Sequence, residues 1–212
     1  METPDVPDET RRRLLRAMAV APVFIALPSL FGAACSGSNT KETAIALSPT
    51  LSCSDDDDDP TVAQTEGPFF TARSPERKSL IDAGAAGTRL VVSGLVLTRS
   101  CKPVPNALLD FWHTDNAGNY DNETYRFRGH QFTDANGAFR LETIIPGQYP
   151  GRTRHIHVKA QARGKSIFTT QLYFPNEPGN ARDGIFHPSL VIAMSGTGST
   201  QEGRFNFVLD LA

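Results

Sequence analysis

Cysteine, charge of one sign and long apolar helical patterns are all scarce in this sequence of 212 residues. Three cysteines are too few for a disulfide scaffold or a zinc–cysteine site. With 21 Lys and Arg against 23 Asp and Glu, the net charge is -2, and basic residues after the N-terminal segment form no stripe. The sequence therefore predicts no nucleic-acid partner. Turn-forming residues are abundant instead: 15 prolines and 17 glycines favour short strands and turns.

Residues 1–34 have the pattern of an export signal. A Thr-Arg-Arg-Arg-Leu-Leu-Arg stretch precedes an apolar run from Ala17 to Ala34, which ends in small residues. Adjacent arginines before Leu-Leu are typical of the twin-arginine route. The segment predicts an exported protein, located in the periplasm, at the cell surface or outside the cell. The alternative is a retained membrane anchor, for which the run is short and interrupted by prolines.

The cysteines leave two questions open. Either Cys35 becomes the lipid-modified first residue of a lipoprotein, or ordinary cleavage takes place near Ala34. In an oxidising compartment, Cys53 and Cys101 could form a disulfide that fixes the preceding segment to the folded domain.

Residues 35–60 predict a linker. They are poor in large apolar groups and end in five consecutive aspartates, residues 55–59, which repel one another and favour a solvated, extended chain. The folded domain is therefore predicted over residues 61–212.

The domain is predicted to be an all-β sandwich of short, mostly antiparallel strands. An Asp-Ala-Asn-Gly turn at 134–137 predicts a hairpin. Ser74 followed by Pro75 predicts a short helical turn capped by the serine, and Gly94 predicts a strand bulge. The expected strands are 90–98, 107–114, 130–133, 139–144, 155–162, 167–174 and 204–211. Long loops at 115–130 and 175–200 are expected to carry much of the functional site.

The segment His155-Ile-His157 begins a candidate metal site. In a strand, side chains alternate between faces, so both imidazoles point to one face while Ile156 and Val158 point to the other. Alone, such a pair is a weak signal that surface histidines also produce. All four tyrosines lie nearby in sequence, between residues 120 and 173. Phenolate is a hard anionic donor that suits ferric iron, so two tyrosines and two histidines together predict an Fe(III) centre.

A larger set of motifs, spread over most of the predicted domain, matches the pattern of a known family. It resembles the intradiol ring-cleavage dioxygenases, the family of protocatechuate 3,4-dioxygenase and catechol 1,2-dioxygenase, over about residues 60 to 190. The matching segments are Glu66-Gly67-Pro68-Phe69, Cys101-Lys-Pro-Val-Pro-Asn-Ala107, Trp112-His-Thr-Asp-Asn-Ala-Gly118-Asn-Tyr120, Arg128-Gly129-His-Gln131-Phe-Thr133-Asp134, Gly137, Thr143-Ile-Ile-Pro146-Gly147-Gln-Tyr149-Pro150 and His155-Ile-His157.

The resemblance implies roles for individual residues. The iron(III) ligands would be Tyr120, Tyr149, His155 and His157. Arg152 would face the bound ring, Gln171 would support it from behind the ligands, and Trp112 would form a wall of the pocket. Tyr149 would be displaced by the substrate and act as general base.

The implied reaction is cleavage of a catechol by O2 between its two hydroxylated carbons, giving a muconate-type diacid. Arg152 would stabilise the charge that develops on the ring. The catechol itself and the oligomeric state, homo-oligomer or monomer, are left open by the sequence. Arg154 replaces a proline common in the family, and we expect it at the pocket mouth, where it would influence substrate choice.

Several alternatives compete with this interpretation. Tyr125 is the rival to Tyr120, although it lacks the Gly-x-Tyr context. His113 is expected to be a packing or surface residue, His130 a hydrogen-bonded strand residue and His187 a loop residue. Tyr173 is expected to share the face of Gln171. A non-catalytic transthyretin-like β-sandwich that binds a partner at the cell surface is the rival function. A zinc or copper hydrolase site does not account for the phenols.

Overall fold

The computed structural model describes residues 59–211. The predicted export segment 1–34, the lipid-modification candidate Cys35 and nearly all of the linker 35–60 lie outside these residues. Within the described part, no helix is long and apolar enough to cross a membrane. Cys101 is disulfide-bonded; Cys53, its predicted partner, lies outside the described residues.

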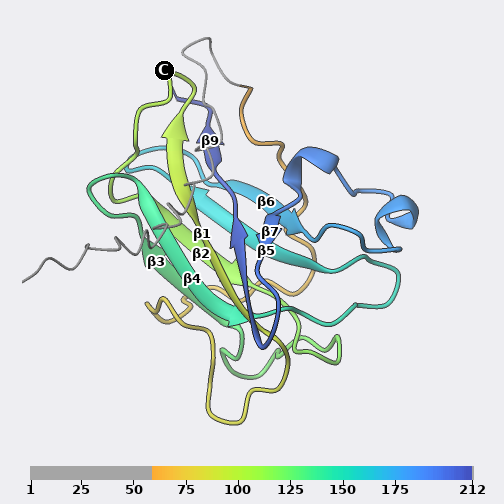
Figure 1. Ribbon diagram of the computed structural model, residues 1–212. Coiled ribbons are helices and arrows are strands. Elements are labelled where there is room, and N and C mark those ends of the chain that lie inside the picture. The colour runs from red at the N-terminus through yellow and green to blue at the C-terminus, as the bar shows by residue number, and fades with distance from the viewer. Residues whose placement is uncertain (1–58, 212) are drawn as a thin grey trace, which may run out of the picture. The chain divides into compact units, whose positions relative to one another are not determined.

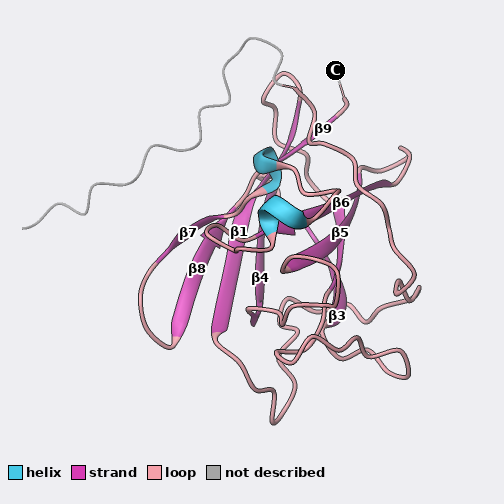
Figure 2. Cartoon of the chain, turned by 90° about the vertical axis from the view of Figure 1, so that its right-hand side faces the viewer, coloured by secondary structure: helices cyan, strands magenta, loops and turns pink. Residues whose placement is uncertain are grey.

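The structure confirms the all-β class and consists of two sheets (Figure 1). One sheet has the order β4 (Ala138–Ile144), β1 (Arg89–Thr98), β8 (Thr200–Arg204), β7 (Ala193–Ser195), with β9 (Phe207–Leu209) pairing the far end of β1. The other has the order β3 (Arg128–Phe132), β2 (Leu108–Trp112), β5 (His155–Gln161), β6 (Phe168–Tyr173). Two single-turn 3-10 helices, η1 (Asn180–Arg182) and η2 (Pro188–Leu190), follow β6 (Figure 2).

The two sheets pack face to face through alternating apolar side chains. On the second sheet, Leu109 and Phe111 of β2 and Ile156 and Val158 of β5 are fully buried in one core cluster with Val92 of β1. Because side chains alternate along a strand, the residues between them point to the opposite face of the sheet. This alternation places His155 and His157 together on the outer face, as predicted.

The last predicted strand, 204–211, is broken in two. Asn206 interrupts the ladder and accepts a hydrogen bond from the backbone N–H of Leu95 through Oδ1 (2.9 Å), while Phe205 N–H donates to Ser93 O (3.1 Å). A Cβ on Gly94 would lie 1.7 Å from Phe205 O. Gly94 therefore permits a close approach of two backbones, and the predicted bulge is wrong, because β1 pairs β4 without interruption from Arg89 to Leu95.

The segment 59–79, here called the arm, runs along the second sheet before β1 begins. Its backbone pairs with Thr169 O through Gln64 N–H (2.8 Å) and with His130 O through Arg77 N–H (2.8 Å). The helical turn predicted at Ser74 is absent. Ser74 Oγ instead donates to Asp110 Oδ1 of β2 (2.8 Å) and lies 3.1 Å from His130 Nδ1. The arm thus covers the face of the sheet that carries the two histidines.

Candidate metal centre

The ends of β2, β5 and β6 place the predicted residues in one row. Strand register pairs Trp112 with His157 and His157 with Gln171, and it pairs His155 with Tyr173 on the next row. Paired residues of neighbouring strands project to the same face. The sheet itself therefore gathers Trp112, His157 and Gln171, which are more than ten residues apart in the sequence.

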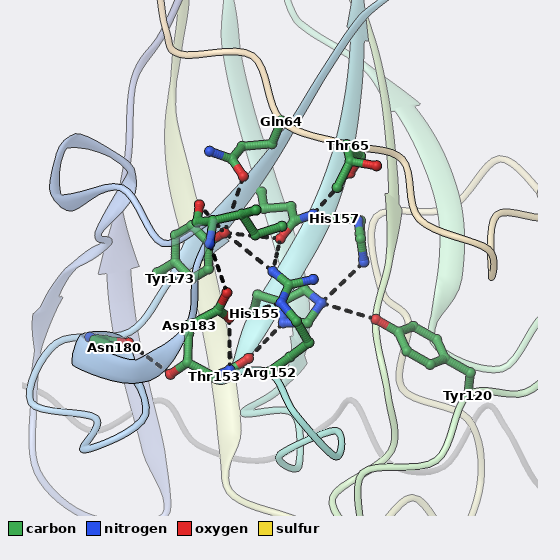
Figure 3. Close-up of polar contacts among 12 residues, drawn as sticks. Gln64, Thr65, Tyr120, Arg152, Thr153, His155, His157, Tyr173, Asn180 and Asp183 are labelled. Atoms are coloured by element: carbon green, nitrogen blue, oxygen red, sulfur yellow. Dashed lines mark hydrogen bonds and ion pairs between the residues drawn. The ribbon is translucent and has the colours of Figure 1, made fainter.

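Two of the predicted ligands meet in direct contact, and a third approaches them from a loop (Figure 3). His155 Nε2 lies 3.1 Å from His157 Nε2 and 3.2 Å from the Tyr120 hydroxyl. The Tyr149 ring lies edge-on to the Tyr120 ring, with centroids 5.8 Å apart. Phe69 of the arm stacks on Tyr120 (4.5 Å) and contacts Tyr149 edge-on (5.4 Å). The structure therefore brings all four candidate ligands into one cluster.

The protonation of this cluster suits metal binding. His155 Nδ1–H donates to Thr153 O (2.7 Å), which leaves the Nε2 lone pair directed at Tyr120 and His157. Burial lowers the pKa of His155 to about 4 and, with His155 and Arg152 nearby, lowers the pKa of His157 well below its ordinary value. Both imidazoles are thus neutral at pH 7, which is the form that binds metals. Burial raises the pKa of Tyr120, so a cation is needed to hold its phenolate.

The donor set fits ferric iron. In the range 59–211, no group of three or more His, Cys, Asp and Glu side chains is placed to hold a metal. The oxygen donor beside the histidine pair is the Tyr120 hydroxyl, with Tyr149 next to it. Phenolate oxygen with imidazole nitrogen suits iron(III) better than zinc or copper(I). His157 Nε2 faces His155 Nε2 at 3.1 Å, so both nitrogens are placed to bind one cation.

Trp112 and Gly67 enclose His157. The Trp112 indole stacks on the imidazole at 4.7 Å and 7°, and Phe70 packs edge-on against the indole at 4.9 Å. A Cβ on Gly67 would lie 3.5 Å from His157 Cε1, and the residue has a φ of +71°. Trp112 therefore packs against the histidine pair, and its role as a wall of the substrate pocket stays a prediction. The contribution of the arm was not predicted.

A hydrogen-bond network extends from the cluster through Arg152. Its Nη2 donates to Gln171 Oε1 (2.6 Å), and its Nε donates to Asp183 Oδ2 (2.8 Å). Gln171 Nε2 in turn donates to Thr65 O of the arm (2.9 Å), and Tyr173 OH donates to Gln171 Oε1 (3.0 Å). Arg152 and Gln171 thus adjoin each other as well as the histidines, and Tyr173 shares their face. Asp183 was missed, because an aspartate in a long loop carries no periodic signal.

The remaining side chains follow their expected places. Tyr125 OH donates to Ala72 O (3.1 Å) rather than joining the cluster. His113 is buried between Thr143 Oγ1 (2.6 Å) and Thr114 O (2.7 Å). His130 belongs to β3, and His187 precedes η2 in a loop.

Arg154 differs from its expected place. It lies just before β5 and its side chain makes contacts elsewhere: its Nη1 donates to Pro146 O (2.9 Å), and its Nε pairs with Glu177 (3.1 Å). It lines a separate cavity of about 550 Å³ to which none of the four candidate ligands contributes. The expectation that Arg154 borders the mouth of the metal cluster is therefore wrong.

Comparisons with known proteins point in the same direction as this geometry. The family model described as Dioxygenase matches residues 65–211. The protocatechuate 3,4-dioxygenase beta chain of Burkholderia cepacia is 36% identical over 118 residues, which are 47% of this chain and 50% of that protein. The chain spans about half the length of the curated relatives it matches.

Solved structures share the fold. The dioxygenase domain of a dioxygenase–carbohydrate-binding protein fusion from Streptomyces sp. SirexAA-E is 55% identical, with a TM-score of 0.71 over 73% of this chain and 100% of that one. An intradiol ring-cleavage dioxygenase from Tetranychus urticae is 26% identical, with a TM-score of 0.64 over 71% of this chain and 93% of that one.

Proposed function

The chain belongs to the dioxygenase family whose model spans residues 65–211, and from that premise we propose that it is an iron(III)-dependent intradiol dioxygenase. It would cleave a catechol-type ring between the two hydroxylated carbons and give a muconate-type diacid. The observation that carries this proposal is the convergence of Tyr120, His155 and His157 at 3.1–3.2 Å, with Tyr149 beside them. Both atoms of O2 enter the product and the substrate supplies the electrons, so no external reductant is needed.

The proposed iron ligands are Tyr120, Tyr149, His155 and His157. When bound, ferric iron would act as the Lewis acid that holds the catecholate and makes its ring reactive towards O2. The protein's contribution to binding is the neutral form of both imidazoles, which burial enforces, and the close placement of two phenols that a cation can ionise.

Two side chains are proposed to act on the substrate. Tyr149 lies in the loop between β4 and β5, and among the described residues its side chain makes ring contacts with Phe69 and Tyr120 but no hydrogen bond. That freedom suits a phenol that accepts a substrate proton at its oxygen as general base. Arg152, which Gln171 and Asp183 hold in place, directs positive charge towards the space beside His155, where it would stabilise negative charge that develops on the ring.

A non-catalytic binding module of transthyretin-like type is the rival function. Such a module would have no use for two buried, neutral histidines beside two partly buried phenols and an arginine. Burying unpaired polar groups costs free energy, so their presence here favours a catalytic or metal-binding purpose.

The decisive test uses the purified protein with ferric iron added. The proposal predicts about one iron per chain, visible absorption from tyrosinate coordination, and O2 uptake with at least one member of a panel of catechols that differ in their ring substituents. A colourless protein that takes up no iron would refute it.

Export is a separate proposal, which rests on residues 1–34 and on Cys35. Fractionation of expressing cells, with metabolic lipid labelling of wild-type chain and of Cys35→Ala, tests it. Protein found only in the cytoplasm would contradict export, and label retained in Cys35→Ala would contradict lipidation at that residue.

A further inference from the structure

Asp183 is a buried carboxylate that is not one of the proposed iron ligands. Its side chain is 1% exposed. Oδ2 accepts two hydrogen bonds, from Arg152 Nε (2.8 Å) and from the backbone N–H of Thr153 (2.9 Å), and Oδ1 accepts one from Ile185 N–H (3.2 Å). A single oxygen atom therefore anchors two consecutive residues of the segment that leads into β5 (Figure 3).

The first of these bonds orients the Arg152 guanidinium. Nε is fixed by Asp183 and Nη2 by Gln171 Oε1 (2.6 Å), so the planar group is held at two of its three nitrogens. Without the carboxylate, Gln171 and the longer contact to Tyr173 OH (3.4 Å) would remain. Two directional hydrogen bonds from different nitrogens fix the orientation of a planar guanidinium, whereas a single one leaves it free to rotate.

The second bond orients a histidine. Asp183 holds the N–H of Thr153, and the carbonyl of the same residue accepts the Nδ1 proton of His155 (2.7 Å). That bond decides which ring nitrogen carries the proton and leaves Nε2 facing His157 and Tyr120. Asp183 therefore acts on His155 through one intervening residue.

The loop that carries Asp183 is itself built onto Thr153. Thr153 Oγ1 donates to Asn180 Oδ1 (2.7 Å), and Asn180 Nδ2 donates to Phe174 O (2.9 Å). A Cβ on Gly179 would lie 2.9 Å from Thr153 Oγ1, so this position needs glycine for the loop to pack so closely. Asp183 N–H closes the turn by donating to Gly179 O (3.0 Å).

We propose that Asp183 is a positioning residue that aligns the Arg152 guanidinium and the His155 imidazole together. One carboxylate thereby couples the charge that faces the substrate to the geometry of an iron ligand. The roles of the two aligned groups rest on the proposed function, whereas the alignment itself does not.

The test compares Asp183→Asn with wild type and with the matched control Asp210→Asn, whose side chain is 77% exposed. Asparagine keeps the size of the side chain but loses its charge and one acceptor oxygen. We expect ferric affinity, measured by competition with a chelator, to weaken about 10–100-fold, the usual effect of losing a partner behind a metal ligand. We expect kcat/KM for the best catechol to fall by a similar factor, while Asp210→Asn changes neither.

Nuclear magnetic resonance of the metal-free protein provides a readout that needs neither iron nor turnover. The Nε proton of Arg152 and the Nδ1 proton of His155 should be protected and sharp in wild type and should broaden or disappear in Asp183→Asn. If wild type binds no ferric iron and cleaves no catechol, the proposed function fails, and these two signals still test the alignment.

A double-mutant cycle with Arg152→Ala separates the effect of Asp183 on Arg152 from its effect on His155. In that background, Asp183→Asn should cost little further turnover but should still weaken ferric affinity through Thr153 and His155. Asn180→Ala, which loosens the same loop and keeps the carboxylate, is a second variant in case Asp183→Asn does not fold; it should weaken ferric affinity less. The proposal would be overturned if Asp183→Asn kept wild-type ferric affinity and an unchanged Arg152 signal. If Asp183→Asn does not fold, the same two results in Asn180→Ala would overturn it.

Discussion

Arg128 offers the sharpest stability prediction, because its guanidinium joins three separate parts of the site. Arg128 on β3 is 1% exposed. It donates from Nε (2.9 Å) and Nη2 (2.6 Å) to Asp121 O, the residue after Tyr120, and from Nη1 (2.5 Å) to Phe69 O on the arm. The group also lies 6.0 Å from the centre of the Tyr120 ring.

The substitution Arg128→Lys keeps the positive charge but removes the planar guanidinium, whose nitrogens donate in several directions. A single ammonium on a linear stem cannot serve both carbonyls in the directions that the guanidinium does. At least two of the three hydrogen bonds to these carbonyls are therefore lost. A hydrogen bond to a charged group contributes a net of about 1.5–3 kcal/mol, so the free energy of unfolding should fall by about 3–6 kcal/mol. That is a large share of the roughly 5–15 kcal/mol typical of a domain.

Urea denaturation of the metal-free protein measures this loss, with Arg140→Lys as the control. Arg140 lies on β4, is 54% exposed and pairs with the partly exposed Glu142. Exposed pairs contribute little, so the control should change stability by less than about 0.5 kcal/mol. Hydrogen exchange should also quicken around residues 69 and 121 in Arg128→Lys. A loss below about 1 kcal/mol, or one equal to the control, would refute the reasoning.

Four further predictions concern other parts of the molecule. His157→Ala should abolish stoichiometric ferric binding, measured by elemental analysis; full occupancy would show that the ligand is misassigned. Tyr149→Phe should retain iron but slow catechol cleavage, about 100-fold or more for loss of a general base, and wild-type turnover would contradict that role. Gly94→Ala should destabilise the domain by several kcal/mol, because its Cβ would lie 1.7 Å from Phe205 O; an unchanged melting temperature would contradict the close approach. The metal-free protein should lose stability as the pH falls from about 6.5 to about 4. His113 and His155 have a folded-state pKa of about 4, so in that pH range they bind protons only in the unfolded state. A stability that does not change with pH in urea titrations would contradict this prediction.

The sign of the pH effect comes from burial. A histidine whose pKa is lowered on folding binds more protons in the unfolded state, so stability increases with pH between the folded and unfolded values. Above about 6.5 both states are neutral and the effect is fully relieved. Both residues are buried without a carboxylate in direct contact, and burial is the largest cause of each shift.

Period-two alternation predicted much of the site. It placed His155 and His157 on one face, and the same rule, applied to β6, placed Tyr173 with Gln171. The rule does not reach Arg154, which lies just before β5; its contacts with Pro146 and Glu177 depend on how distant segments pack.

Long-range contacts account for what the sequence could not predict. Ser74 has the local signal of a helix cap, but Asp110 and His130, from strands far along the chain, supply stronger partners for its hydroxyl. Asp183 and the Phe69 segment acquire their roles only once β5 and β6 are folded beside them. The break at Asn206 likewise depends on β1, because the Asn206 side chain accepts a hydrogen bond from the backbone N–H of Leu95.

The measurement that tests the central claim most directly is the identity of the product made from a catechol under 18O2. The account predicts a diacid opened between the two hydroxylated carbons, with both atoms of one O2 molecule incorporated, seen by mass spectrometry and formed only by iron-loaded protein. A product opened beside the hydroxylated carbons, a product without label, or no product from any catechol with iron bound would contradict it.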